Sequence, residues 1–373
     1  MTQPDHRGPL AHLHDALDVL EQRGLRRFPP KTIADTTVSF CSNDYLGLAD
    51  RFAPSAATTG SGASRLIDGE RGAHSEMERA FAAWLGVESV LAFTSGYAAN
   101  VGTLAALAAP GDLVVSYALN HASLIDGARL SRARVVVAPH NDLDAVAKAL
   151  AERTETRAWV VVESYYSMDA DGPDLRELRR ICDEHGAALY VDEAHALGVL
   201  GPDGRGRCGE AGVFPDVLVG TLGKAFGSRG AFVGGVAVLR EGLWIRARSC
   251  VFSTGLAPMA AVAAQRALEE VIRSPALRRH VAELSGRLRD GLTELGLRPM
   301  GFGHVVPVLI GESARAVKLS GRLAERGVIV PPIRPPTVPD GTARLRLTVT
   351  ARHQASDIDA VVDAFQHTIE ASR

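Results

Sequence analysis

AWVVVE at residues 158–163 is an unbroken apolar run that ends in a carboxylate, and ALYVD at residues 188–192 ends in the same way. Between these runs, apolar residues recur at helical spacing from Leu175 to Cys182, and Gly186 stops the pattern. Strands that are apolar at consecutive positions are typical of parallel sheets, in which helices cover both faces. The stretch therefore predicts a strand, helix, strand unit of a mainly parallel, buried sheet.

The same alternation continues towards the N-terminus. Short apolar runs alternate there with longer amphipathic segments. Strands are expected at residues 90–93, 112–116 and 134–138, and helices at residues 75–85, 97–108, 122–130 and 142–153. This order predicts an α/β fold, in which a ligand binds beyond the carboxyl ends of the strands.

Polar side chains stand where these strands end. Ser95, Glu163, Asp192 and Thr221 each close or directly follow an apolar run. Because the carboxyl ends of parallel strands meet at one edge of a sheet, we expect these side chains to converge on one crevice.

Bulk properties exclude several classes of protein. The formal net charge is −2 over 373 residues, which argues against a primary role at nucleic acid or at a membrane surface. The N-terminus carries charge and proline rather than an apolar signal core, and no segment approaches the ~20 apolar residues of a membrane span. The four cysteines are far apart and lack C-x-x-C spacing, so we expect free thiols, no metal site and a cytoplasmic protein.

Lys224 is the residue that points to a chemistry. Only four of the 41 basic residues are lysines, and Lys224 lies in VGTLGKAFG at residues 219–227, after an apolar run and between glycines. A lysine amine can lose its proton in a dry site and attack a carbonyl, whereas a guanidinium stays protonated. Lys31, in a loop, and Lys148 and Lys318, on amphipathic helices, are expected to be ordinary surface charges.

Several familiar motifs are incomplete. DEAH at residues 192–195 has the letters of a nucleotide-hydrolase motif, but Leu218 stands where the phosphate loop G-x-x-x-x-G-K-[ST] needs its first glycine, and Ala225 follows the lysine. Neither H-E-x-x-H nor G-x-S-x-G occurs, which disfavours a zinc protease and a nucleophile-elbow hydrolase. TSGYAAN at residues 94–100 lacks the G-x-G-x-x-G of a dinucleotide site.

Three remaining features fit one cofactor. Ser95-Gly96-Tyr97 opens a helix, whose first backbone N–H groups and dipole can bind a phosphate. Pyridoxal phosphate needs such a cradle, a lysine that bonds its aldehyde and an acid that faces its ring nitrogen. We therefore expect a pyridoxal-phosphate enzyme with Lys224 and Asp192 as the other two anchors.

Six short motifs, spread over nearly the whole chain, carry a resemblance to a known family. They are SNDYLGL at residues 42–48, GSGASRL at 60–66, NHASL at 120–124, SMD at 167–169, DEAH at 192–195 and TLGK at 221–224. With them the sequence resembles the α-oxoamine synthases, fold-type-I pyridoxal-phosphate enzymes that condense an amino acid with an acyl thioester and release carbon dioxide. IRPPTVP at 333–339 and GTARLR at 341–346 are most similar to the members that join L-alanine to a pimeloyl thioester, which gives 8-amino-7-oxononanoate for biotin.

The resemblance implies roles around the cofactor. Lys224 would hold pyridoxal phosphate covalently and later remove the α-proton of the amino acid. His121 would stack on the ring face, and Asp192 would pair with the ring nitrogen. The other implied contacts are His195 and Ser167 at the phenolic oxygen, and Gly96, Tyr97, Thr221 and the neighbouring subunit's counterpart of Ser253 at the phosphate.

The resemblance also implies contacts to the substrates. Arg346 would clamp the alanine carboxylate, because a planar guanidinium bonds both oxygens. Arg26 would meet the acyl chain or its carrier group, with Arg23 and Arg27 close enough in sequence to take that place. Thr337 and Asn43 would line the same acyl channel.

The implied architecture is that of fold type I. An N-terminal arm would cover residues 1–40, with a helix at 11–23 and an end at Pro29-Pro30. A large domain at 41–272 would hold a mainly parallel seven-stranded sheet. A small α/β domain at 273–373 would contain helices at 277–295 and 313–326 and strands at 304–310 and 343–349. A homodimer is implied, because the family's site is shared by two chains, and the loop at 59–72 would reach that interface.

Alternatives remain at the level of the substrate. NHASLIDG at 120–127 and GTLGKA at 220–225 resemble the glycine-using 2-amino-3-ketobutyrate ligase, also called glycine C-acetyltransferase, as much as the alanine-using members. A non-catalytic binding or regulatory protein on this fold would lose Lys224 or Asp192, and neither is lost. SYY at 164–166 replaces small and Val-Phe residues, so the wall under the cofactor would be more polar. Coenzyme A and an acyl carrier protein both stay open as carrier of the pimeloyl group.

Overall fold

The structure, a computed structural model, describes residues 11–27, 37–52 and 58–370. Pro29, Pro30 and Lys31, for which we predicted a loop at the end of the arm, lie outside these residues. Lys148 and Lys318 are exposed on helices, as predicted.

Within the described residues the chain forms two units. The large unit holds residues 43–283 together with 350–352, and the small unit holds the described parts of 1–42, 284–349 and 353–373. The N-terminal residues therefore group with the C-terminal ones instead of forming a separate arm. The large unit also ends at residue 283, inside helix α11 (Pro275–Glu294), rather than at 272, because the first half of α11 groups with the large unit.

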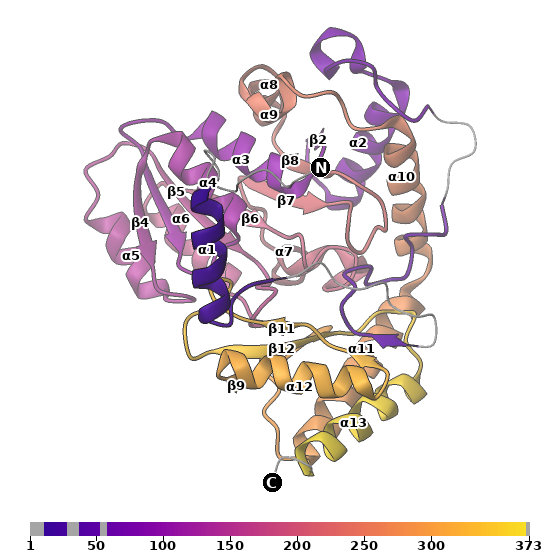
Figure 1. Cartoon of the computed structure of the whole chain (residues 1–373). Helices are drawn as coiled ribbons and strands as arrows, with labels where there is room; N and C mark the ends of the chain where they lie inside the picture. The colour runs from indigo at the N-terminus through magenta and orange to yellow at the C-terminus, as the bar shows by residue number, and fades with distance from the viewer. Residues whose placement is uncertain (1–10, 28–36, 53–57, 371–373) are drawn as a thin grey trace, which may run out of the picture. The chain divides into compact units, whose positions relative to one another are not determined.

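A seven-stranded sheet is the centre of the large unit (Figure 1), which confirms the predicted α/β class. The strand order is β2-β8-β7-β6-β5-β3-β4, and β8 alone runs antiparallel to its neighbours. The strands are β2 (Ser89–Phe93), β3 (Leu113–Tyr117), β4 (Arg134–Ala138), β5 (Ala158–Glu163), β6 (Ala188–Asp192), β7 (Val217–Thr221) and β8 (Ala231–Gly235).

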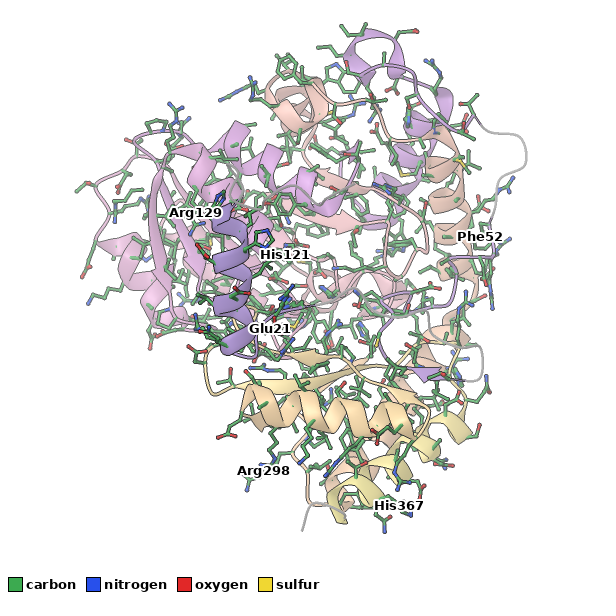
Figure 2. The ribbon with its side chains drawn as sticks, in the orientation of Figure 1. Glu21, Phe52, His121, Arg129, Arg298 and His367 are labelled. Carbon is green, nitrogen blue, oxygen red and sulfur yellow. The ribbon has the colours of Figure 1, made fainter. Side chains whose placement is uncertain are left out.

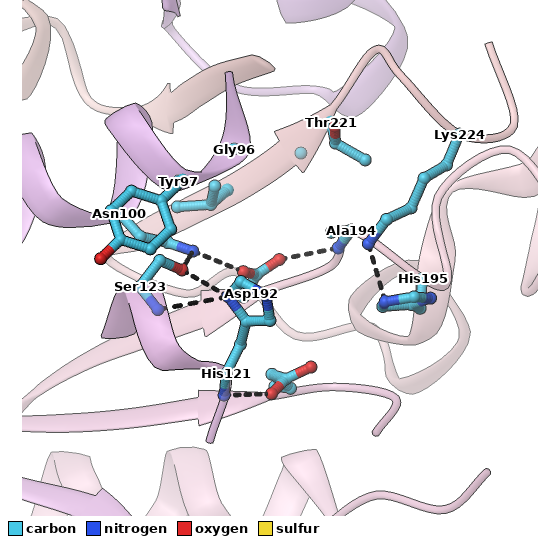
Figure 3. A pocket seen from close by; sticks show the side chains of 13 residues that line it. Gly96, Tyr97, Asn100, His121, Ser123, Asp192, Ala194, His195, Thr221 and Lys224 are labelled. Atoms are coloured by element: carbon cyan, nitrogen blue, oxygen red, sulfur yellow. Dashed lines mark hydrogen bonds between the residues drawn. The ribbon is translucent and has the colours of Figure 1, made fainter. Parts of the chain in front are cut away.

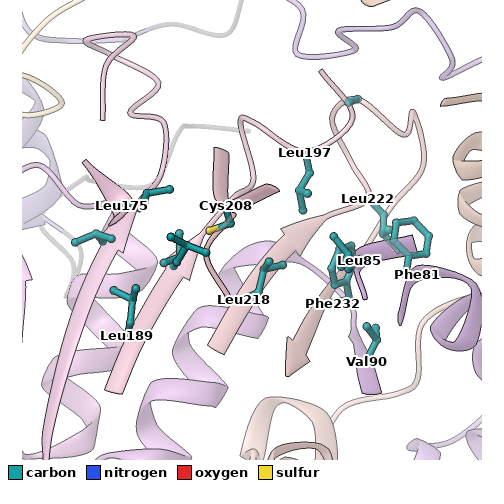
Figure 4. Packing of buried hydrophobic residues seen from close by; sticks show 14 of the residues in the cluster. Phe81, Leu85, Val90, Leu175, Leu189, Leu197, Cys208, Leu218, Leu222 and Phe232 are labelled. Carbon is teal, nitrogen blue, oxygen red and sulfur yellow. The ribbon is translucent and has the colours of Figure 1, made fainter. Parts of the chain in front are cut away.

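Both faces of the central strands β3, β5 and β6 are buried, as their unbroken apolar runs predicted, whereas the edge strand β4 is largely exposed. Along β5, Val160 and Val162 enter one hydrophobic cluster and Val161 enters another, because successive side chains of a strand point to opposite faces. In the first cluster, the ring of Phe81 lies 4.9 Å from that of Phe232, centroid to centroid (Figure 4). This packing fixes the strand ends on which the polar residues stand.

Helices connect the strands of the large unit. Several begin at side-chain caps: Asp142 accepts the N–H of Ala145, and Asp174 accepts those of Arg176 and Glu177. The helices are η1 (Arg65–Gly69), α2 (Gly72–Leu85), α3 (Gly96–Leu107), α4 (Ala122–Ser131), α5 (Leu143–Ala151), α6 (Leu175–Glu184), η2 (Pro202–Gly204), α7 (Gly206–Ala211), α8 (Ala237–Arg246), α9 (Arg248–Val251) and α10 (Pro258–Arg273).

The small unit contains a three-stranded antiparallel sheet of order β11-β12-β9 and a separate parallel pair of β1 with β10. Its predicted helices and strands are present, with ends that shift by one or two residues. Its elements are α1 (Ala11–Gln22), β1 (Val38–Ser39), β9 (Val305–Gly311), α12 (Ser313–Glu325), β10 (Val328–Ile329), β11 (Pro332–Ile333), β12 (Ala343–Thr348) and α13 (Ala355–Glu370), with most of α11. Among the described residues, no helix combines the length and the apolar character that a membrane span requires.

A buried ionic network anchors the segment at residues 59–72 to the rest of the large unit. Arg65, on η1, has a side chain that is only 2% exposed, and it pairs with Glu78 of α2 and with Glu70. Glu78 also accepts the N–H of Ala92 at 2.8 Å and pairs with Arg240 at 3.1 Å. One carboxylate therefore ties η1, α2, β2 and α8 together.

We predict that Glu78→Ala lowers the free energy of unfolding by about 3–5 kcal/mol, because it leaves buried guanidinium and N–H groups without their acceptor. Chemical denaturation of the purified variant measures this loss. Glu177→Ala removes a pair with Arg180 on the exposed face of α6 and should leave the unfolding midpoint almost unchanged. Equal midpoints for both variants would show that the network adds nothing to stability.

Candidate active site

A cavity of about 190 Å³ lies beyond the carboxyl ends of β5, β6 and β7 (Figure 3). Glu163, Asp192 and Thr221, which close these strands, all line it. The first residues of α3 also line it, and Ser95 caps that helix by accepting the N–H of Ala98 at 3.1 Å. Three of the four residues predicted to converge, Glu163, Asp192 and Thr221, therefore line one crevice, whereas Ser95 is not among its lining residues.

Lys224 reaches this cavity from the turn that follows β7. The backbone of that turn needs a glycine at Gly227, which has a φ of +56° and whose added Cβ would lie 2.4 Å from the backbone nitrogen of Ala49. The Nζ of Lys224 lies 2.7 Å from Nε2 of His195 (Figure 3). The amine therefore has a specific hydrogen-bonding partner at the edge of the cavity.

His195 links the lysine to a buried tyrosine. Its Nδ1 lies 2.6 Å from the hydroxyl of Tyr45, which is fully buried. That hydroxyl also lies 3.3 Å from Oδ1 of Asn43. Both ring nitrogens of His195 are thus engaged, one by Lys224 and one by Tyr45. Such a chain can pass a proton to or from the amine as the imidazole changes tautomer.

Asp192 is a buried carboxylate held by neutral donors. Its Oδ2 accepts Nδ2 of Asn100 at 2.7 Å, and its Oδ1 accepts the N–H of Ala194 at 2.8 Å. Asn100 is itself fixed by the hydroxyl of Tyr190 at 2.8 Å. Among the described residues, no arginine or lysine forms an ion pair with Asp192. The carboxylate therefore presents a negative charge to the cavity, suited to a cationic group of a ligand.

His121 stands at the start of α4. Its Nδ1 lies 2.8 Å from the hydroxyl of Ser123, and its backbone N–H donates to Oε1 of Glu163 at 2.6 Å. Burial lowers the pKa of its imidazole below the ordinary value, although the charge of Asp192 acts in the opposite direction. A neutral, flat ring with a fixed edge therefore lines the cavity (Figure 3).

Backbone donors and one hydroxyl stand at the β7 side of the cavity. Gly96 and Tyr97 occupy the first turn of α3, where N–H groups have no carbonyl of their own helix to bond. The hydroxyl of Thr221 lies beside Gly96, at 3.8 Å from the position of an added Cβ. The phenol of Tyr97 bonds Asp126, which raises its pKa. This arrangement suits a phosphate, because the dipole and the N–H groups favour an anion.

Two of the predicted cofactor contacts lie elsewhere. Ser167 and Ser253 are not among the residues that line this cavity in the described part of the chain. Ser253 follows α9 and bonds the carbonyl of Thr254 at 3.4 Å. The prediction that Ser253 acts in a neighbouring subunit, and the one that Ser167 faces the phenolic oxygen, stay predictions.

Two of the three predicted acyl-substrate residues meet in a cavity of about 690 Å³ within the small unit. Arg26 and Thr337 both line it, and Arg27 donates to the hydroxyl of Thr337 at 3.2 Å. Arg26 forms an ion pair with Glu21. Figure 2 labels Glu21 at the end of α1. Arg346 is buried on β12 and is absent from the lining of this cavity. Asn43 belongs to the large unit, where Tyr45 bonds it.

Sequence reasoning missed several residues of the first cavity. Asn100 and Ser123 had been given no role, and Glu163 had been noted only as a strand end. Tyr45 had been quoted only as part of a motif. A signal for Asn100 existed, because a buried amide in an otherwise apolar helix needs a polar partner.

The cavity fits pyridoxal phosphate on its own chemistry. A buried carboxylate without a cationic partner matches a protonated ring nitrogen, and a lysine amine at the edge matches an aldehyde. The N–H groups of α3 and the hydroxyl of Thr221 match a phosphate. The flat imidazole of His121 offers a stacking surface.

Comparisons with known proteins agree with this chemistry. The model of the family Aminotransferase class I and II matches residues 35–365. The 8-amino-7-oxononanoate synthase of Anaeromyxobacter dehalogenans is 45% identical over 96% of this chain and 95% of its own length. That of Geobacter sulfurreducens is 46% identical over 88% of this chain and 87% of its own length.

Solved structures resemble the chain over nearly its whole length. A variant of the serine palmitoyltransferase of S. paucimobilis, with a bound aldimine of pyridoxal phosphate and myriocin, has a TM-score of 0.90 at 26% identity, covering 98% of this chain and 99% of its own. The 8-amino-7-oxononanoate synthase of Francisella tularensis has a TM-score of 0.79 at 24% identity, covering 91% and 99%, and this likeness shows the fold. The chain therefore belongs to the class I and II aminotransferase family of pyridoxal-phosphate enzymes and, within it, to the α-oxoamine synthases that include 8-amino-7-oxononanoate synthase.

Proposed function

We propose that this protein condenses L-alanine with a pimeloyl thioester and releases carbon dioxide and the thiol, which gives 8-amino-7-oxononanoate in biotin biosynthesis. The observation that carries the proposal is the meeting of Lys224, His195, Asp192 and His121 in one cavity at the strand ends. The name of its relatives at 43–46% identity supports the choice of reaction. A non-catalytic protein on this fold would have no need of this lysine and this buried acid together.

Each residue of the cavity has one part in holding the cofactor. Lys224 bonds the aldehyde, Asp192 bonds the ring nitrogen and keeps it protonated, and His121 stacks on the ring. The N–H groups of Gly96 and Tyr97 and the hydroxyl of Thr221 hold the phosphate, and His195 and Ser167 face the phenolic oxygen. When bound, pyridoxal phosphate supplies a protonated ring that draws electron density from the Cα of the amino acid.

The lysine and the histidine move the protons. With the cofactor bound, Lys224 would be the group that removes the α-proton of the amino acid, and its hydrogen bond to His195 would keep the amine in place. Because Tyr45 engages the far nitrogen of His195, the imidazole can take a proton from the amine and return it. The same pair returns a proton to the product after carbon dioxide has left.

The other predicted site residues bind the substrates. The guanidinium of Arg346 binds the alanine carboxylate, since its planar fork bonds two oxygens and fixes the Cα–H bond for removal. Arg26 and Thr337 bind the acyl chain in the cavity that they share, and Asn43 contacts the acyl substrate.

We further propose a cytoplasmic homodimer. All four cysteines are free thiols, which fits a reducing compartment. Four large apolar side chains are exposed on η1, on α8 and directly after α9, namely Ile67 at 78%, Val238 at 70%, Ile245 at 71% and Phe252 at 73%. Helix α8 contacts α9, and α9 contacts η1. The four residues therefore form an apolar surface suited to a second copy of the chain. Ser253 follows directly after Phe252, which supports its placement at a phosphate of the neighbouring subunit.

We predict that borohydride treatment of the purified, yellow protein fixes the cofactor on one peptide, the one that contains Lys224. Peptide mass spectrometry locates the added mass. Lys224→Ala should show no such peptide, while Lys148→Ala, at an exposed lysine, should behave as the unchanged protein. A tagged peptide without residue 224 would remove the basis of the proposed chemistry.

We predict that L-alanine changes the absorption spectrum of the bound cofactor at lower concentration than glycine or L-serine does. The extra methyl group adds contact in a closed site, which is worth about 10–200-fold in discrimination. A spectral response to glycine alone would favour the 2-amino-3-ketobutyrate ligase activity instead. With alanine bound, turnover of pimeloyl-CoA against its carrier-protein ester identifies the acyl donor.

We predict that the protein sediments as a dimer, at twice its chain mass of 39.5 kDa, and that Phe252→Asp shifts it to the monomer. A charge in a buried apolar interface is costly unless it is paired. Leu309→Asp, at an exposed position of β9, should remain dimeric. Sedimentation of both variants as dimers would place the interface elsewhere.

A further inference from the structure

We propose that Glu163 is a positioning residue whose buried carboxyl group fixes the backbone at His121 and so holds the imidazole against the ring of the cofactor. This inference rests on the proposed function, because that function gives His121 its stacking role.

The contact between the two residues is short and direct. Glu163 is the last residue of β5, and its Oε1 accepts the backbone N–H of His121 at 2.6 Å. His121 is the N-cap of α4, so its N–H has no carbonyl partner inside the helix. Among the described residues, this N–H is the only group that donates to the carboxyl of Glu163. The carboxyl therefore ties the start of α4 to the end of a central strand.

The residue before His121 is held from the same side. The hydroxyl of Tyr166 donates to Oδ1 of Asn120 at 2.8 Å and accepts the N–H of Glu163 at 3.2 Å. Nδ2 of Asn120 donates to the carbonyl of Val161 at 2.8 Å. Two consecutive residues are thus fixed by β5 and the loop after it, and the imidazole has little freedom to tilt.

Glu163 also faces the second acid of the cavity. Its register partner on the neighbouring strand is Asp192, and both residues are 6% exposed. Asp192 accepts two hydrogen bonds, from Asn100 and Ala194, whereas Glu163 accepts one. Two buried carboxylates side by side do not both ionise readily, so the less solvated one keeps its proton.

Three titratable groups lie around Glu163, namely Asp192, Lys224 and Tyr166. Burial and then the charge of Asp192 raise the pKa of the Glu163 carboxyl to about 8, while Lys224 and the N–H of His121 act in the opposite direction. The phenol of Tyr166, in the following loop, is the other titratable group beside it. At neutral pH the carboxyl is therefore largely protonated, and it ionises as the pH passes through about 8. That step adds a second negative charge beside Asp192 at the cofactor site.

Two substitutions separate the parts of this role. Glu163→Gln keeps an oxygen that accepts the His121 N–H but cannot ionise, and Glu163→Ala removes the acceptor. We expect Glu163→Ala to weaken binding of pyridoxal phosphate to the apoprotein by about tenfold and to reduce the induced circular dichroism of the bound cofactor. Glu163→Gln should stay within about twofold of the unchanged protein in both measurements at neutral pH.

The proton NMR signal of the His121 imidazole in the apoprotein tests whether Glu163 ionises. The signal is assigned by its absence in His121→Asn. In the unchanged protein this signal should show an inflection near pH 8, the value to which the Glu163 pKa is raised, and in Glu163→Gln that inflection should be absent. The NMR measurement needs no cofactor, and it decides the question even where Glu163→Ala fails to fold.

The outcomes distinguish this inference from the proposed function. Cofactor affinity and dichroism of Glu163→Ala equal to those of the unchanged protein would overturn the positioning role. Equal impairment of Glu163→Gln and Glu163→Ala would overturn it too, as would an inflection near pH 8 that persists in Glu163→Gln. An unchanged protein that binds no pyridoxal phosphate would instead contradict the proposed function, and the NMR titration would still report on Glu163.

Discussion

The burial of the Asp192 carboxylate at the end of β6 is the constraint on which the site depends. Moving a carboxylate out of water costs several kcal/mol even after the protein relaxes around it. Hydrogen bonds from Asn100 and from the N–H of Ala194 offset part of this cost, and a hydrogen bond from the hydroxyl of Tyr190 orients the Asn100 amide. A cation that enters the cavity offsets the remaining cost. A protonated ring nitrogen carries the positive charge that is needed.

The same buried charge sets the state of its neighbours. Glu163 ends the adjacent strand, and the charge of Asp192 helps to keep it protonated. His121 is neutral because burial outweighs the attraction of that charge. Lys224 approaches from the opposite side with His195 as its partner. The side chains of Asp192, Glu163, His121 and Lys224 therefore share one small cavity. The strand that each residue ends or follows determines its position in that cavity.

Much of this could be predicted from the sequence. The strands at 134–138, 158–163 and 188–192 have the bounds that their apolar runs indicate. Burial explains the apolar runs of β5 and β6, whereas β4 is an edge strand on which Val135 and Val137 are exposed. β8 was not predicted, since AFVGG is short and ends in glycines. η1 was not predicted either, because its stability comes from Arg65, whose partners Glu78 and Glu70 are chosen by the fold. The end of the large unit was misplaced because α11 runs through it without a break.

The sequence by itself determined the α/β class, the parallel strands and the identity of the lysine, the acid and the helix start that suit the cofactor, because each leaves a local pattern of polarity. Only the tertiary structure decided that Tyr45 bonds His195, that Asn100 bonds Asp192 and that Glu163 holds His121. These partners lie between 42 and 150 positions apart in the chain, and hydrogen bonds at such separations leave no periodicity. They exist because parallel strands bring their carboxyl ends to one edge, where groups buried together must satisfy one another.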